Sequence, residues 1–97
     1  MNITKTLDGD KLTVQLEGRL DTTTAPSLEA ELGDFSEAES MVIDFSELKY
    51  ISSAGLRVIL AAHKAMAKKK GLVLTNINDD IMEIFEITGF ADILNIM

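Results

Sequence analysis

Two adjacent serines, Ser52 and Ser53, begin a long helical pattern that follows an apolar stretch and a short connection. The first N–H groups of a helix have no partner within the helix, and the positive end of the helix dipole lies there. A phosphate ester on Ser53 would therefore be stabilised locally. Since the small residues Ala54 and Gly55 follow, we expect the active site of another protein to reach the hydroxyl. A simpler interpretation stays open from these residues alone, in which Ser52 or Ser53 is only the N-cap of the helix.

Other residues that could do chemistry are few. Histidine occurs once, as His63, on the apolar stripe of the same predicted helix, where a packed side chain is the simpler interpretation. The pair Asp79-Asp80 lies at a predicted helix start, where acids interact favourably with the dipole. The chain has no cysteine, no glycine-rich dinucleotide motif and no phosphate loop. We therefore expect no catalytic residue, no metal site and no cofactor, and a protein that is not an enzyme.

A phosphoacceptor receiver domain is one alternative, in which Asp44 would follow a central strand and accept the phosphate. Such domains need an acidic pair after the first strand to hold a metal ion, and a lysine after a late strand. Here the first strand ends in Leu7-Asp8 at a hairpin, and the late strand ends in the residues 75–77, which are Thr-Asn-Ile. The receiver hypothesis therefore fails.

Composition and charge limit the class of protein. The 97 residues are 46% apolar and 26% charged, which is typical of one globular domain. Nine basic and 16 acidic residues leave a net charge of −7, which argues against nucleic acid or an anionic membrane as the main partner. No apolar run approaches the roughly 20 residues of a membrane span, and the amino terminus lacks the pattern of a signal peptide. We expect a cytoplasmic monomer.

Acidic residues concentrate in the segment 29–47, which holds seven acids and no base. We interpret this segment as a solvated helix face and loop, rather than as a docking site for a basic partner. The seven acids are Glu29, Glu31, Asp34, Glu37, Glu39, Asp44 and Glu47.

Alternating apolar residues predict an N-terminal β-hairpin. Ile3 and Leu7 fall on one face of the first strand, and Leu12 and Leu16 on one face of the second. Gly9-Asp10 suits a two-residue type II′ turn, since glycine readily adopts the positive φ of the first central position. This register pairs residue 7 with 12, 5 with 14 and 3 with 16.

The apolar period then changes to that of helices with buried strands between them. Thr24 is expected to cap a helix that has Pro26 in its first turn and ends at Gly33. Residues 41–43, Met-Val-Ile, lack alternation, which predicts a short strand covered on both faces. A wide apolar surface over residues 54–70 predicts a long helix embedded against a sheet.

The last third of the chain continues this order. Residues 72–74 predict another buried strand, and Asn78 or Asp79 is expected to cap a helix that Gly89 ends. Residues 90–97 fit either a short helix or a strand. The order β-β-α-β-α-β-α plus a tail predicts one α/β domain over residues 1–97. We expect a mixed sheet of about four strands that begins with the hairpin, packed against three to four helices.

Three segments together resemble the STAS-domain anti-sigma factor antagonists, which are small bacterial regulators in partner-switching cascades. GRLDTTTAP at 18–26 is similar to the family's element before the first helix, and VIDFSELKYISSAGLRVIL at 42–60 to its strand, loop and phosphoserine helix. KGLVLTNIN followed by IFEITGF resembles the late strand and helix end. The resemblance spans nearly the whole chain and implies a single STAS domain.

Residue by residue, the resemblance implies that Ser53 is the phosphorylated serine, two residues before Gly55. Ser52 stands where well-known members have aspartate, which makes it a minor alternative acceptor. Without the resemblance, Asp21 is a turn or cap residue ahead of the first helix. The resemblance also implies a partner-binding surface, which comprises Asp21, Thr22, Thr23, Thr24, Ser52, Ser53, Ala54, Gly55 and Leu56.

The function that the resemblance implies is a protein–protein switch. The unphosphorylated domain would bind an anti-sigma factor that is also a serine kinase, and so release the sigma factor. Phosphorylation of Ser53, with ATP and magnesium supplied by the kinase, would end this binding, and a PP2C-type serine phosphatase would reset it. Two alternatives stay open: a small regulatory STAS subunit of a lipid-transporting ABC system, and nucleotide binding or slow hydrolysis by the domain itself. The missing phosphate loop disfavours the last.

Overall fold

The computed structural model describes residues 1–33 and 38–97, so Asp34 and Glu37 of the acidic segment lie outside the described residues. The predicted order of elements is confirmed, and the tail adds a short 3-10 helix and a strand. The elements are β1 (Asn2–Asp8), β2 (Lys11–Leu20), α1 (Ala25–Gly33), β3 (Ser40–Ile51), α2 (Ser53–Ala67), β4 (Gly71–Thr75), α3 (Asp79–Thr88), η1 (Phe90–Asp92) and β5 (Asn95–Ile96).

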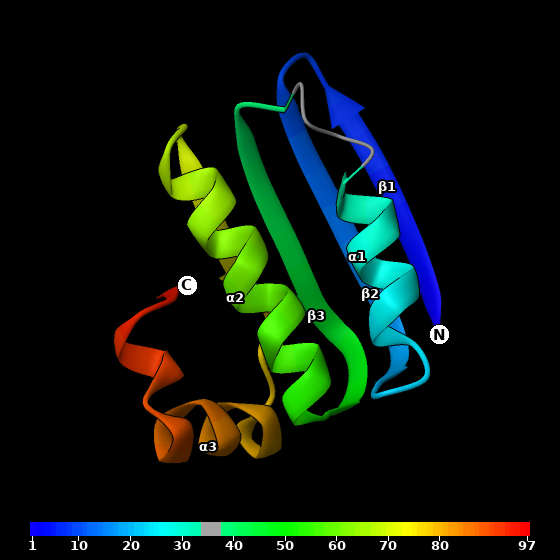
Figure 1. Ribbon diagram of the computed structural model, residues 1–97, viewed down its shortest axis with the longest axis vertical. Helices are drawn as coiled ribbons and strands as arrows, with labels where there is room; N and C mark the ends of the chain where they lie inside the picture. Colours follow the sequence, from blue (N-terminus) through cyan, green and yellow to red (C-terminus); the bar gives the residue numbers. More distant parts are fainter. Residues whose placement is uncertain (34–37) are drawn as a thin grey trace.

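One sheet runs through the molecule in the strand order β1-β2-β3-β4-β5. The hairpin pair β1–β2 is antiparallel, and the other three pairs are parallel. The tail pairs with β4 as β5, so the sheet has five strands where the sequence predicted about four. Helices α1 and α2 lie side by side on one face of the sheet, with α3 at its lower end in Figure 1.

The hairpin forms in the predicted register. Leu7 pairs with Leu12, and Asp8 pairs with Lys11 across the turn. Gly9 has a φ of +63°, whereas Asp10 keeps a negative φ, as a type II′ turn requires. The turn residues and the apolar alternation therefore specify the same pairing.

The strand predicted at 41–43 is longer than expected, and only one of its faces is covered. β3 extends from Ser40 to Ile51 because its pairing with β2 continues to Leu20. Met41, Ile43 and Phe45 point into the core and are buried, while Val42 between them is half-buried. The prediction of a strand covered on both faces is wrong, because α1 and α2 pack on the same side of the sheet.

The ends of the helices follow most of the predicted signals. Asn78 caps α3 by accepting a hydrogen bond from the N–H of Ile81 at 2.9 Å, and Gly89 ends the helix with a φ of +81°. Helix α2 ends at Ala67, three residues before the predicted end, and residues 68–70 form a turn into β4. Thr24 directly precedes α1 as expected, but its hydroxyl does not cap the helix: it accepts a hydrogen bond from the N–H of Asp21 and donates one to the carbonyl of Arg19 in β2.

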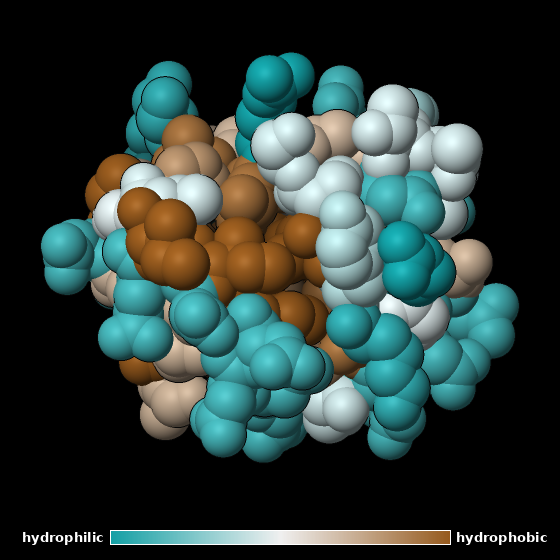
Figure 2. Space-filling view, turned by 90° about the horizontal axis from the view of Figure 1, so that it is seen from below, coloured by the Kyte–Doolittle hydropathy of each residue, from teal (hydrophilic) through white to brown (hydrophobic). Residues whose placement is uncertain are grey.

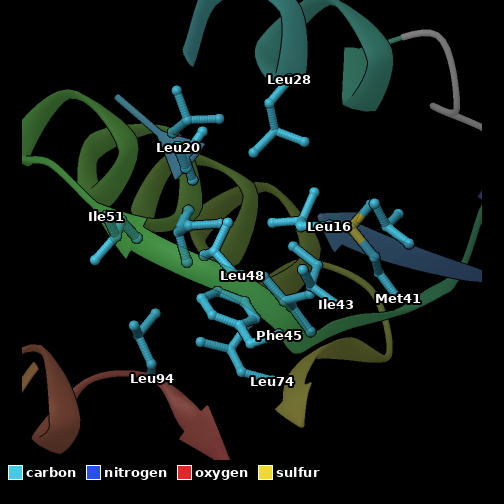
Figure 3. Packing of buried hydrophobic residues seen from close by; sticks show 14 of the residues in the cluster. Leu16, Leu20, Leu28, Met41, Ile43, Phe45, Leu48, Ile51, Leu74 and Leu94 are labelled. Carbon is cyan, nitrogen blue, oxygen red and sulfur yellow. The ribbon is translucent and has the colours of Figure 1, made fainter. Parts of the chain in front are cut away.

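The core fills the space between the sheet and the helices. Figure 3 shows Leu20, Leu48 and Phe45 from two neighbouring strands packed against one another. The Phe45 ring meets the edge of Phe85 from α3, with 6.1 Å between ring centroids. No polar or charged residue is buried within residues 1–33 and 38–97, and no helix in this part of the chain is long and apolar enough to cross a membrane.

Candidate functional site

The site is built where β2 and β3 end together. Leu20 and Ile51 are partners at the last step of this parallel pair. The N–H of Ser52 then donates to the carbonyl of Leu20 at 2.9 Å. Since parallel strands end at the same edge of a sheet, the loop 21–24 after β2 lies beside the start of α2 after β3. The sheet therefore brings together two segments that are thirty residues apart in the sequence.

The two serines have different roles at this edge. Ser52 has extended backbone angles, and its Oγ accepts a hydrogen bond from the N–H of Gly55 at 3.3 Å, so it is the N-cap of α2. Ser53 is the first residue of α2, its side chain is exposed, and it makes no side-chain hydrogen bond to the described residues. The N-cap interpretation therefore holds for Ser52 and leaves the Ser53 hydroxyl available.

Gly55 and Leu56 lie under the site rather than on its surface. Gly55 is buried, and a Cβ at this position would lie 2.6 Å from Cγ of Leu20. Leu56 is only 5% exposed. The reason expected for access to the Ser53 hydroxyl, small side chains at Ala54 and Gly55, does not hold for Gly55, because its missing side chain makes room on the core side. Gly55 lets α2 begin close against the end of β2, while Ala54 is half-buried above it.

Asp21 organises the loop that faces the serines. Its Oδ1 accepts hydrogen bonds from the N–H of Thr23 at 3.0 Å, from the Thr23 hydroxyl at 2.7 Å and from the N–H of Thr24 at 3.2 Å. These bonds, led by the one from the Thr23 hydroxyl, hold the pKa of Asp21 below its usual value. Thr24 closes the loop, since its hydroxyl donates to the carbonyl of Arg19 at 2.9 Å. Thr22 and Thr23 remain exposed.

Arg19 and Tyr50 flank the same edge, and sequence reasoning missed both. The two residues are partners in the β2–β3 pair. The Arg19 guanidinium lies 4.2 Å from the centre of the Tyr50 ring, and its Nε is 3.7 Å from Oδ2 of Asp21. Each residue directly precedes the last residue of its strand. Their proximity can be recognised only once the register of β2 and β3 is known.

Figure 2 looks onto this end of the molecule. Polar and weakly polar side chains cover the side on which the loop 21–24 lies in Figure 1. Hydrophobic side chains gather toward the side of α3, where Ile87 is 77% exposed. The end that carries Ser53 therefore has a mixed surface, as protein-binding sites commonly do.

Comparison with known proteins decides the family. A model of the STAS domain matches residues 2–97. The chain belongs to the STAS domain family. It is 35% identical to the anti-sigma-B factor antagonist of Listeria monocytogenes, over 99% of this chain and 90% of that protein. It is 29% identical to the anti-sigma-B factor antagonist of Bacillus subtilis, with the same coverage of 99% and 90%.

Solved structures show the same fold at low sequence identity. The unphosphorylated anti-sigma factor antagonist SpoIIAA superposes with a TM-score of 0.78 at 15% identity, over 99% of this chain and 87% of that one. An anti-sigma factor antagonist from Mycobacterium paratuberculosis has a TM-score of 0.88 at 22% identity, over 98% and 83% of the two chains. The predicted α/β class is thereby confirmed as the STAS fold.

Two further polar residues that the sequence analysis considered for chemistry are Asp44 and His63. Asp44 accepts hydrogen bonds from the Asn76 side chain at 3.0 Å and from the N–H of Ser46 at 2.9 Å. Burial opposes ionisation of Asp44, but these bonds outweigh it and hold its pKa below the usual value. His63 is half-buried, and its Nδ1 has no hydrogen-bond partner among the residues that the structure describes. Within the described ranges, no group of three or more acidic or histidine side chains is arranged to hold a metal ion.

Proposed function

We propose that this STAS domain is an anti-sigma factor antagonist whose binding is switched off by phosphorylation of Ser53. The observation that carries the proposal is the exposed Ser53 hydroxyl at the first residue of α2, beside the loop 21–24. It occurs in a chain whose relatives, matched over 99% of its length, are named anti-sigma-B factor antagonists. The unphosphorylated domain binds an anti-sigma factor that is also a serine kinase, and the sigma factor is released.

Electrostatics explains why a phosphate reverses this binding. Phosphorylation adds a charge of about −1.5 to −2. A contact surface fitted to a neutral serine leaves this charge desolvated and unpaired, which costs several kcal/mol. Since about 1.4 kcal/mol changes affinity tenfold, we expect phosphorylation to weaken binding by about 100-fold or more.

The partner contacts divide into exposed and supporting residues. Thr22, Thr23 and Ser53 are exposed and form the contact itself, together with the part of Ala54 that reaches the surface. The supporting residues hold this surface in place from below or through the loop. They are Asp21, Thr24, Ser52, Gly55 and Leu56. Ser52 is a minor alternative acceptor, because its hydroxyl is half-buried and already caps the helix.

The partners follow from the switch. We propose a cytoplasmic, monomeric regulator that acts by binding, with no catalysis and no cofactor of its own. The anti-sigma factor kinase supplies ATP and magnesium, and a PP2C-type serine phosphatase restores the free hydroxyl. The subunit of a lipid-transporting ABC system is not favoured, because the relatives described above carry the antagonist name.

Paired baits test the proposal. Native lysate is passed over three immobilised variants of the domain, Ser53→Ala, Ser53→Asp and Ser27→Asp, and the retained proteins are identified by mass spectrometry. Ser27 is a matched control because it is also exposed in the first turn of a helix, α1. We expect a serine kinase of the anti-sigma type on the Ser53→Ala and Ser27→Asp baits and its loss from Ser53→Asp.

Two outcomes would contradict the proposal. Equal recovery of the kinase on all three baits would mean that charge at Ser53 does not control binding. Recovery of transporter subunits on all three baits, without a kinase, would support the ABC-subunit function instead. Ser53 would then be a surface residue of the helix start with no switching role.

A further inference from the structure

Arg57 lies one helical turn after Ser53 on the exposed side of α2. The two residues are four apart in a continuous helix, and both side chains are exposed. Side chains at positions i and i+4 of a helix are neighbours on its surface, with Cβ atoms about 5–6 Å apart. The guanidinium of Arg57 is therefore within reach of any group attached to the Ser53 hydroxyl.

Arg57 has no acidic partner of its own among the described residues. The ion pairs in this part of the chain are Lys5–Glu31, Arg19–Asp21 and Lys70–Asp10. Arg57 lines a hollow of about 470 Å³ between α1 and α2, which is also lined by Thr22 and Ala54 beside the site. Glu29 of α1 lines the same hollow but makes no ion pair with Arg57.

We propose that Arg57 binds the phosphate of phosphorylated Ser53 within the free domain. This inference rests on the proposed function, because it assumes that Ser53 is the residue modified. The guanidinium presents a planar fork of N–H donors that matches phosphate oxygens, and charge-assisted bonds of this kind are stronger than neutral ones. The proposal rests on the position of Arg57. The N–H groups at the start of α2 are not enough, because they would attract any anion equally.

The ion pair between Arg57 and the phosphate on Ser53 gives a second reason why phosphorylation weakens partner binding. An anti-sigma factor that approaches the modified domain must cover the phosphate and also displace or bury Arg57. The phosphorylated free form is stabilised by the pair, whereas the bound form loses it. Arg57 therefore shifts the modified domain further toward release, beyond the repulsion caused by the phosphate charge.

Few other charged groups lie near this turn. Asp21 in the loop after β2 and Glu29 of α1 are acidic and raise the pKa of a neighbouring phosphate. Arg19 is held by Tyr50 and by Asp21. None of these groups changes when Arg57 is replaced, so the difference between variants reports on Arg57 itself.

The test measures the second pKa of the phosphate by ³¹P NMR in the full chain. Phosphoserine is installed at position 53 in the wild type, Arg57→Gln, Arg57→Lys and Lys64→Gln. A neighbouring cation favours the doubly charged phosphate and so lowers this pKa, which is near 6 for an isolated phosphoserine. We expect Arg57→Gln to raise the pKa by about 0.3, a twofold change in proton affinity.

Lys64→Gln is the matched control. It removes the same charge from an exposed position of the same helix, but it lies eleven residues from Ser53, or about 16 Å along the helix. We expect no change in the phosphate pKa for this variant, and partial retention of the wild-type value in Arg57→Lys. The difference caused by Arg57→Gln should disappear in about 1 M salt, because the pair is exposed.

An equal phosphate pKa in the wild type and Arg57→Gln would overturn the inference. An equal rise in Arg57→Gln and Lys64→Gln would also overturn it, because that result reports net charge only. The experiment uses no anti-sigma factor, so its failure is distinguishable from failure of the proposed switch, which the paired baits measure.

Discussion

Gly55 is the position where a single methyl group tests the packing beneath the site. A Cβ added at Gly55 would lie 2.6 Å from Cγ of Leu20 and 3.0 Å from Cγ1 of Ile51. Both neighbours are in the core, with exposures of 0% and 2%. Cγ of Leu20 is the branching atom of its side chain and cannot turn away as a flexible end would. The Gly55→Ala variant must therefore push the end of β2 away from α2.

The size of the effect is a balance of two terms. Alanine in place of glycine inside a helix stabilises by about 1 kcal/mol. Overpacking a filled core costs about 1–3 kcal/mol, and a contact well under 3.0 Å favours the upper part of that range. We expect Gly55→Ala to lower the free energy of unfolding by about 1–2 kcal/mol, equivalent to a fall in Tm of about 5–10 °C for a domain of this size.

Urea unfolding followed by circular dichroism measures this change, since the chain has no tryptophan for fluorescence. Gly33→Ala is the matched control, because Gly33 is also helical and a Cβ there would meet no described atom within 4 Å. We expect this control to be as stable as the wild type or more stable by up to about 1 kcal/mol. A Gly55→Ala variant as stable as the wild type would refute the packing argument.

Three further substitutions test other parts of the structure. Asn78→Ala removes the cap of α3 and the bond to the carbonyl of Leu48 at 3.1 Å, so urea unfolding should show a loss of about 1–2 kcal/mol. Ser52→Ala removes a longer cap bond of 3.3 Å and should cost about 0.5–1 kcal/mol in the same assay. Hydrogen bonds hold the pKa of Asp44 in the folded state below its usual value, so its ionised form stabilises the fold at higher pH and this contribution is lost as pH falls through the folded pKa. The difference in unfolding free energy between the wild type and Asp44→Asn should therefore shrink between about pH 5 and pH 2, and a constant difference would contradict it.

Local signals were sufficient to predict most elements of this STAS domain. The alternation of Leu12 and Leu16 with a glycine in the turn specified the hairpin register, because any slip would move the apolar face into solvent. Asn78 and Gly89 marked the two ends of α3, since capping depends on residues within one helical turn. The serines at the start of α2 were predictable for the same reason, but the sequence left open which of them caps the helix, and the structure shows that it is Ser52.

Long-range pairing decided what the sequence could not specify. The length of β3 depends on its pairing with β2 as far as Leu20, and the two-residue β5 exists only because β4 offers an edge. The same pairing places Arg19 beside Tyr50 and buries Gly55 against Leu20. The sequence by itself determined that a pair of serines begins α2, because helix starts are local. The surface around the exposed serine is a product of the tertiary structure, because strand partners distant in sequence must meet to form it.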